Sequence, residues 1–279
     1  MTKAALWMAG WLAAMTVMAV AGREATRELD VFQIMLLRSS IGLVMLWPLI
    51  HDNGGFGTLG TAHPWHHVGR NIVHFGAQFG WLYALTLISI AQVVAIEFTM
   101  PIWVAMLAVA FLGERMGLWK NLAVALGLVG VVVIVRPLGG EVNAGQLIAL
   151  ASAVGFATSV IVVKSLSCIE RPVVILFWMM IIQSAIGLIP ALAVWRWPSA
   201  YTWAWVLVIA FCGTYSHYCM TRALQHAEAT IVVPMDFLRV PLAALLGWLV
   251  YAEQVDLLTG VGAALILVGN LLNLKSAKP

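Results

Sequence analysis

Charged residues are scarce in this sequence. They make up 10% of its 279 residues, whereas hydrophobic residues make up 62%, and the mean hydropathy is +0.97. A soluble globular protein carries about 25% charged residues, so this chain has too few to cover a soluble surface. A disordered chain needs low hydrophobicity and high charge, which is the opposite composition. The composition therefore indicates an integral membrane protein.

Cysteine frameworks and basic runs are also missing. The three cysteines, Cys168, Cys212 and Cys219, suggest neither a disulfide framework nor a metal-ligand cluster. Fifteen basic and twelve acidic residues give a net charge of +3 without a basic run. Nucleic-acid binding depends on such clustered positive charge. We therefore expect no nucleic-acid partner, no metal site and no cofactor.

Sequence motifs of common enzymes are absent. The chain contains no GxxxxGK[ST] phosphate loop and no H-E-x-x-H metal motif. It also lacks the G-x-S-x-G turn that carries a nucleophilic serine. The missing phosphate loop argues against ATP hydrolysis by this chain, and we predict that it is not an enzyme.

Apolar segments fill most of the chain. A helix needs about 20 mostly apolar residues to cross the hydrocarbon core of a bilayer. The first apolar segment follows Lys3 and ends in small residues, as a signal peptide does, but another span follows it closely, so we expect it to be retained. The sequence predicts an all-α, polytopic protein with ten transmembrane helices, at residues 4–21, 31–50, 68–86, 89–112, 117–135, 144–163, 172–195, 203–222, 229–251 and 256–273.

Lysine and arginine counts predict the orientation of these helices. With the N-terminus inside, the inner segments hold nine Lys and Arg residues and the outer loops hold four. Positive residues accumulate on the cytoplasmic side of membrane proteins. We therefore expect a multi-pass protein of the cytoplasmic (inner) membrane with both termini in the cytoplasm.

The second half of the chain repeats features of the first at a constant offset of 139 residues. Glu97 falls on Asp236, and Glu114 falls on Glu253. This offset predicts two five-helix repeats, residues 1–139 and 140–279. Because five is an odd number of crossings, the second repeat should be inverted relative to the first. Inverted repeats are typical of secondary transporters, whose substrate site lies near the midplane between the halves.

Motifs that close the fourth predicted helix of each half, and one that ends the fifth helix of the chain, carry a family resemblance. They are the segments Pro101–Arg115, Val131–Pro137 and Pro241–Glu253. With them the chain resembles the EamA-type transporters of the drug/metabolite transporter superfamily. That resemblance implies ten helices in two halves. It also implies transport of a small organic metabolite or drug, in a superfamily that carries amino acids, nucleotide sugars, vitamins and drugs.

Four ionisable residues lie within predicted spans, at Arg38, Glu97, Asp236 and Arg239. Such groups cost about 2.5–3.5 kcal/mol each on insertion scales, so each needs a reason to be there. One interpretation is a set of internal ion pairs that hold the two halves together. The other is that the four residues line a central cavity, bind polar groups of a substrate and carry a proton.

Polar and aromatic residues add further candidates for the cavity. His74, Gln78 and Trp81 are spaced to share one helix face. Tyr215 and His217 form a comparable patch in the eighth predicted span. A polar face of a membrane helix should look at a cavity or at another helix. We predict that Gln78, Trp81, Tyr215 and His217 contribute to the substrate cavity, although packing alone also explains a lone histidine or tryptophan.

Prolines interrupt two of the predicted spans, at Pro101, Pro234 and Pro241. Each removes a backbone hydrogen bond and can kink its helix. Kinks beside an acidic residue are typical of the broken helices of transporters. Simple packing is the alternative explanation, because proline is common in membrane helices.

These features together predict a secondary transporter that works by alternating access, with a small molecule and the lipid bilayer as its partners. A non-transport membrane protein, such as an intramembrane enzyme or an assembly subunit, is the alternative. A homodimer is compatible with the sequence. If transport is proton-coupled, we expect Glu97 to carry the proton, because it has no basic residue within one helical turn, whereas Asp236 has Arg239 on its own helix face.

Overall fold

The computed structural model describes residues 2–112, 118–135, 143–227, 232, 239, 248–250, 252 and 256–276. Within these residues the secondary structure is helical throughout, without a strand. The helices are α1 (Thr2–Ala25), α2 (Val31–Met45), α3 (Trp47–Asp52), a short 3-10 turn (Phe56–Thr58), α4 (Pro64–Leu87), α5 (Ile90–Glu97), α6 (Met100–Leu112), α7 (Leu118–Val135), α8 (Ala144–Ser167), α9 (Pro172–Ala193), α10 (Ala200–His226) and α13 (Leu257–Ser276).

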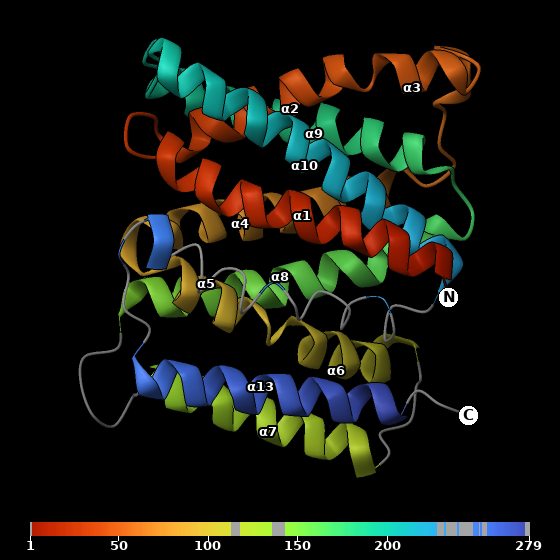
Figure 1. The fold of residues 1–279 in the computed structure, drawn as a ribbon. Coiled ribbons are helices and arrows are strands. Elements are labelled where there is room, and N and C mark those ends of the chain that lie inside the picture. Colours follow the sequence, from red (N-terminus) through yellow and green to blue (C-terminus); the bar gives the residue numbers. More distant parts are fainter. Residues whose placement is uncertain are drawn as a thin grey trace.

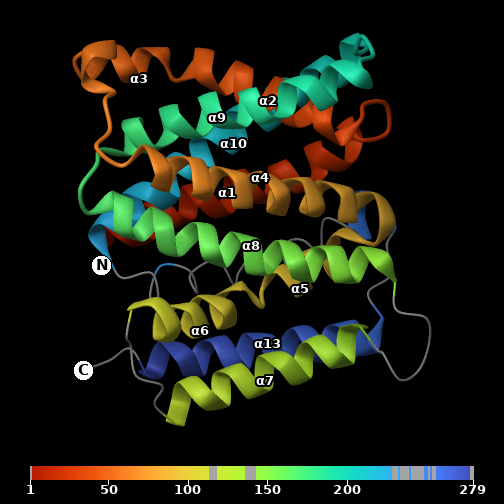
Figure 2. The ribbon, with the colours of Figure 1, turned by 180° about the vertical axis from the view of Figure 1, so that it is seen from behind.

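Helices from opposite ends of the chain pack side by side. The main pairs are α1 with α10, α2 with α9, α4 with α8, and α7 with α13 (Figures 1 and 2). Each pair joins a helix that precedes residue 140 to one that follows it. α2, α3 and α9 form one edge of the bundle, and α7 and α13 form the opposite edge. α5 and α6 lie between α8 and the α7–α13 pair (Figure 1).

Several helices are suited to a bilayer. By length and composition, four of the described helical segments could each cross a membrane, and shorter apolar helices accompany them. The prediction of an all-α membrane protein is thereby confirmed, while its count of ten spans stays a prediction. The four segments are Lys3–Ala25, Val31–Asp52, Ala144–Ser167 and Pro172–Ala193.

Two of the predicted spans are interrupted in the structure. The span at residues 31–50 is divided at Leu46 into α2 and α3, and Pro48 follows this break. The span at residues 89–112 is divided at Phe98 and Thr99 into α5 and α6. Pro101 has no N–H to donate to the carbonyl of Glu97, four residues earlier, so a regular helix cannot continue there. Most of the predicted span 229–251 lies outside the described residues, including Pro234 and Pro241.

Side chains near the helix ends set where several helices begin. Asp30 accepts a 2.8 Å hydrogen bond from the backbone N–H of Phe32 at the start of α2. Ser89 and Ser199 cap α5 and α10 in a similar way. Capping residues satisfy backbone N–H groups that have no partner inside the helix. The short turns before these helices are therefore fixed by local sequence.

Small residues allow α4 and α8 to approach closely. A Cβ atom at Gly80 would lie 2.5 Å from the Oγ atom of Ser152, whereas a Cβ atom at Gly76 would meet nothing within 4 Å. Stripes of small residues are a common means of packing membrane helices. The contact at Gly80 holds α4 and α8 together along one wall of the cavity described next.

Candidate functional site

A cavity lies at the centre of the bundle, with a volume of about 60 Å³ open to a water-sized molecule. Side chains of α1, α4, α5, α6, α8 and α10 surround it, so both halves of the chain contribute. Most of the wall is apolar, and a few buried polar groups face the same space. Ligand sites in proteins commonly have this composition. The apolar wall consists of Trp11, Met15, Met18, Trp81, Met100, Phe156, Val160, Val163, Met220 and Leu224.

One face of α4 supplies most of the polar groups. Arg70, His74, Gln78 and Trp81 all line the cavity, and each is at most 5% exposed. Their spacing of four, four and three residues brings them onto one side of the helix. The structure therefore places Gln78 and Trp81, both predicted from the sequence, on the cavity wall. Arg70 is an addition, because the sequence prediction assigned it to the inner end of the span and gave it no role in the cavity.

Glu97 is held between two donors at the end of α5. The Nη2 atom of Arg239 donates a 2.8 Å hydrogen bond to one carboxylate oxygen, and the Nε1 atom of Trp81 donates one of 2.8 Å to the other. All three side chains are buried. The guanidinium of Arg239 also lies 5.3 Å from the centre of the Phe98 ring. This arrangement is a buried ion pair that joins the two halves of the chain.

The ion pair changes one sequence-based argument. Glu97 was expected to carry a proton because no basic residue lies within one turn of it along the helix. That premise holds along the helix, but it does not leave Glu97 without a cation, because Arg239 reaches it across the bundle. Asp236, the predicted counterpart of Glu97, lies outside the described residues.

Arg38 is fully buried in α2. Its Nη1 atom lies 3.5 Å from the Oε1 atom of Gln183 on α9, and its Nε and Nη2 atoms have no hydrogen-bond partner among the described residues. A Cβ atom at position 213 would lie 2.3 Å from the Nε atom of Arg38, so the glycine there makes room for the guanidinium. Arg38 is not part of the cavity wall.

Within the described part of the chain, Arg70 is bonded to neutral groups. Its Nε atom donates a 2.9 Å hydrogen bond to the Oγ atom of Ser159, and its Nη1 atom donates one of 3.1 Å to the Oδ1 atom of Asn71. Asn71 is also 3.5 Å from the side-chain nitrogen of Gln183, the residue that contacts Arg38. A chain of neutral amides therefore connects the two buried arginines, Arg38 and Arg70.

Two histidines meet across the cavity. The ring centres of His74 on α4 and His217 on α10 are 4.9 Å apart, and Phe156 and Trp11 lie beside them. Both ring nitrogens of His74 lack a hydrogen-bond partner among the described residues. His217, a predicted cavity residue, therefore does line the cavity.

Tyr215 does not line the cavity, contrary to the sequence prediction. Its side chain is 39% exposed and stacks on the ring of Phe211, with 5.8 Å between ring centres. Tyr215 and His217 are two residues apart, which corresponds to about 200° around an α-helix. The two side chains therefore point to different faces of α10, and only His217 turns inward.

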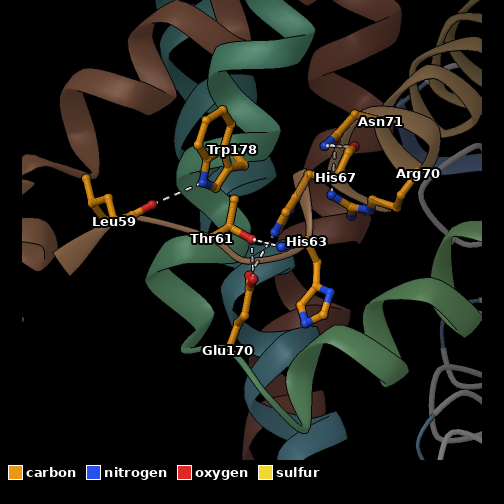
Figure 3. Close-up of polar contacts among 8 residues, drawn as sticks. All are labelled: Leu59, Thr61, His63, His67, Arg70, Asn71, Glu170 and Trp178. Atoms are coloured by element: carbon orange, nitrogen blue, oxygen red, sulfur yellow. Dashed lines mark hydrogen bonds and ion pairs between the residues drawn. The ribbon is translucent and has the colours of Figure 1, made fainter. Parts of the chain in front are cut away.

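A second group of polar residues closes the end of the bundle where α1 begins (Figure 3). Thr61 donates a hydrogen bond to Glu170, and the Nε2 atom of His67 is 2.7 Å from the other carboxylate oxygen of Glu170. We call Thr61, His67 and Glu170 the loop cluster. It ties the loop before α4 to the turn between α8 and α9. His67 precedes Arg70 by three residues on α4, so the loop cluster lies next to the Arg70 end of the cavity.

The opposite end of the bundle is tied by Glu28, in the turn between α1 and α2. Glu28 accepts hydrogen bonds of 2.7 Å from the backbone N–H and from the hydroxyl of Ser199, and a further bond from Thr202. These donors, Thr202 foremost, lower the pKa of Glu28 below its ordinary value of 4.5. A lowered pKa means that the ionised form stabilises the fold. This contribution is complete above pH 4.5 and is lost as the pH falls through the lower pKa of the folded state.

We therefore expect Glu28→Gln to lower the melting temperature in detergent at pH 7, by an amount that stays steady down to about pH 4.5 and shrinks below it. The measurement is a series of thermal melts of the parent and the variant between pH 3 and pH 7. Asp52→Asn serves as the control, because Asp52 is 78% exposed. A melting difference that stays constant over this range would contradict the assignment.

Comparison with known proteins shows to which family this chain belongs. The EamA-like transporter family model matches residues 2–136 and 143–275, which is nearly the whole chain in two segments. One solved crystal structure aligns with a TM-score of 0.74 over 99% of this chain and 98% of its own, at 19% sequence identity. At that identity the likeness concerns the fold alone. The class defined by the helical bundle and its cavity is that of membrane transporters, and the chain belongs to the EamA-like transporter family.

Named relatives are similar over most of their length. A riboflavin transporter of Rhizobium johnstonii is 31% identical over 78% of this chain and 72% of its own. An S-adenosylmethionine uptake transporter of Rickettsia felis is 26% identical over 90% of this chain and 85% of its own. A pseudopaline exporter of Pseudomonas aeruginosa is 27% identical over 88% and 87%. The expectation of a membrane transporter of small metabolites is thereby confirmed.

Proposed function

We propose that the chain is a secondary transporter that carries an organic metabolite through the central cavity by alternating access. The observation that carries this proposal is the cavity itself, which lies between helices of both halves and combines an apolar wall with buried polar groups. Exchange of access between its two ends would require one half of the bundle to move against the other. The loop cluster at one end and the bonds of Glu28 at the other are the contacts that such a movement would break in turn.

The wall of the cavity favours a substrate that contains a flat ring. Trp11, Trp81, Phe156 and His217 line it, and aromatic side chains stack well on planar groups. The names of two relatives agree with this choice, because riboflavin and S-adenosylmethionine each contain a fused aromatic ring system. We therefore propose a vitamin-like or nucleoside-like metabolite as the substrate class, with riboflavin as the first compound to test.

The proposal is tested by filling the cavity. Met15 on α1 lines the cavity and is 7% exposed, whereas Val17 on the same helix faces outward and is 45% exposed. We expect Met15→Trp to reduce uptake of labelled riboflavin into proteoliposomes at least about tenfold, because the larger side chain occupies the space of the substrate. Val17→Trp, the matched control, should leave uptake within about twofold of the parent. Equal uptake by both variants would refute passage through this cavity.

We further propose that both ends of the chain face the cytoplasm. The first turn of α1 and the last turn of α13 lie on the same side of the bundle (Figure 1), and the count of Lys and Arg residues favours the cytoplasm for that side. A reporter fused to the C-terminus should read inside, and one inserted after Arg196 should read outside. The reverse pattern would overturn the orientation.

A further inference from the structure

We propose that Arg70 forms a subsite for an oxyanion, so that the transported metabolite carries a carboxylate or a phosphate group. This inference rests on the proposed function and narrows its substrate class. It starts from a contrast between two buried arginines: Arg70, which lines the cavity, and Arg239, which is bonded to the cavity residue Glu97. Arg239 is neutralised by Glu97 at 2.8 Å. Arg70 is 5% exposed, yet it has no carboxylate partner among the described residues.

The bonds of Arg70 leave part of the guanidinium available. A guanidinium has five N–H groups. One donates to Ser159 and one to Asn71, both neutral oxygens, and no described group accepts from the Nη2 atom. Burying a charge is costly unless an opposite charge compensates it. Arginine presents a planar fork that matches a carboxylate or a phosphate, and such charge-assisted bonds are the strong ones. An oxyanion is therefore the ligand that fits the unused N–H groups.

Arg38 adds a second buried positive charge near Arg70. It contacts Gln183, which contacts Asn71, which accepts from Arg70. Neutral amides orient the two guanidinium groups but do not cancel their charge. Two adjacent cations with neutral partners attract an anion more strongly than one. Arg38 has no carboxylate partner among the described residues either.

Two further side chains of the same face of α4 are poised for a ligand. His74 is 4% exposed, and both its ring nitrogens lack partners among the described residues. Gln78 is 3% exposed, and its carbonyl oxygen lacks one as well. Buried polar atoms in proteins are almost always hydrogen-bonded, so unpartnered ones that line a cavity indicate a missing ligand. A neutral histidine can donate one bond to an oxyanion, and the oxygen of Gln78 can accept one from a hydroxyl or amino group of the same metabolite.

The test uses pairs of compounds that differ only in the anionic group. Nicotinate is compared with nicotinamide for a carboxylate, and flavin mononucleotide with riboflavin for a phosphate. Binding to the purified full chain in detergent is measured by thermal shift and by titration at constant ionic strength. We expect at least one acid to bind about tenfold to a hundredfold more tightly than its neutral partner, as is usual for a hydrogen-bonded charge. The acid that does so tells a carboxylate site from a phosphate site.

Variants assign that preference to Arg70. We expect Arg70→Gln to abolish the preference for the acid, and Arg70→Lys, which keeps the charge without the fork, to retain part of it. Arg27→Gln is the control, because the side chain of Arg27 is 62% exposed. The melting temperature without ligand shows whether each variant folds. If Arg70→Gln does not fold, Arg70→Lys takes its place in the binding test.

Two outcomes overturn the subsite. One is that neither acid binds more tightly than its neutral partner, and the other is that the preference survives in the Arg70 variants. The proposed function fails separately. Acid-specific binding without uptake into proteoliposomes would refute transport but support the oxyanion subsite. Uptake of riboflavin with no preference for acids would support transport but refute the subsite.

Discussion

Replacing Arg239 with glutamine is expected to lower the free energy of unfolding by about 3–5 kcal/mol. The substitution leaves the carboxylate of Glu97 buried, 4% exposed, and among the described residues the indole N–H of Trp81 is then its one remaining donor. An uncompensated charge in such a place is the main cause of large single-residue losses. The loss should be among the largest for a polar residue of the chain, because the ion pair is also a contact between the two halves.

A double variant separates the contribution of the ion pair to stability from the contribution of packing. Glu97→Gln together with Arg239→Gln removes both charges, so we expect it to be more stable than Arg239→Gln alone. Unfolding is followed by chemical denaturation in detergent micelles, with Lys3→Gln as an exposed control whose unfolding curve should stay close to that of the parent. A double variant as unstable as the single one would show that packing, and not charge, sets the loss.

Removing the carboxylate of Glu170 is expected to have the second largest effect. Glu170→Ala takes away the acceptor for Thr61 and the partner of His67, whose side chain is fully buried. Leaving a buried polar group without a partner costs about 1–3 kcal/mol, so we expect a loss of about 2–3 kcal/mol in the free energy of unfolding. Glu170→Gln keeps an acceptor and should lose less.

The control for Glu170 is Asp52, which lies on the same side of the bundle. Asp52 and His51 are 3.8 Å apart, and both side chains are 78% exposed. Exposed pairs of this kind contribute about 0–1 kcal/mol, so Asp52→Ala should leave the unfolding curve nearly unchanged. If Glu170→Ala behaves like Asp52→Ala, the loop cluster does not hold this end of the bundle closed. Uptake measured on the same samples shows whether a weakened cluster also alters transport.

Features that depend on neighbours along one helix were predicted well from the sequence. His74, Gln78 and Trp81 share a helix face by their spacing alone, and the structure places all three on the cavity wall. Apolar segments of sufficient length predicted where most described helices lie. The break at Leu46 was not predicted, because apolar character continues through it, although Pro48 was visible in the sequence. The break at Phe98 and Thr99 lies beside Pro101, where the sequence predicted a kink.

Features that depend on contacts between helices could not be predicted from the spacing of residues along one helix. The partner of Glu97 is Arg239, from a different helix, and sequence spacing gives no measure of that distance. Arg70 was assigned to the end of a span because positive residues usually lie there, yet the helix α4 begins earlier, at Pro64, and buries it. The position of Tyr215 could have been predicted, since a two-residue step from His217 reverses its direction on a helix.

The pairing of early helices with late ones has a consequence for how the protein is made. α1 packs along α10, and α2 along α9, so the first helices to leave the ribosome have partners that are synthesised much later. Until then their polar groups, such as Arg38, must remain in the bilayer without the contacts that bury them in the finished fold. Biogenesis therefore depends on a period in which the nascent first half is protected by lipid or by the insertion machinery. A chain shortened before α9 would keep its apolar segments and still lack a stable structure.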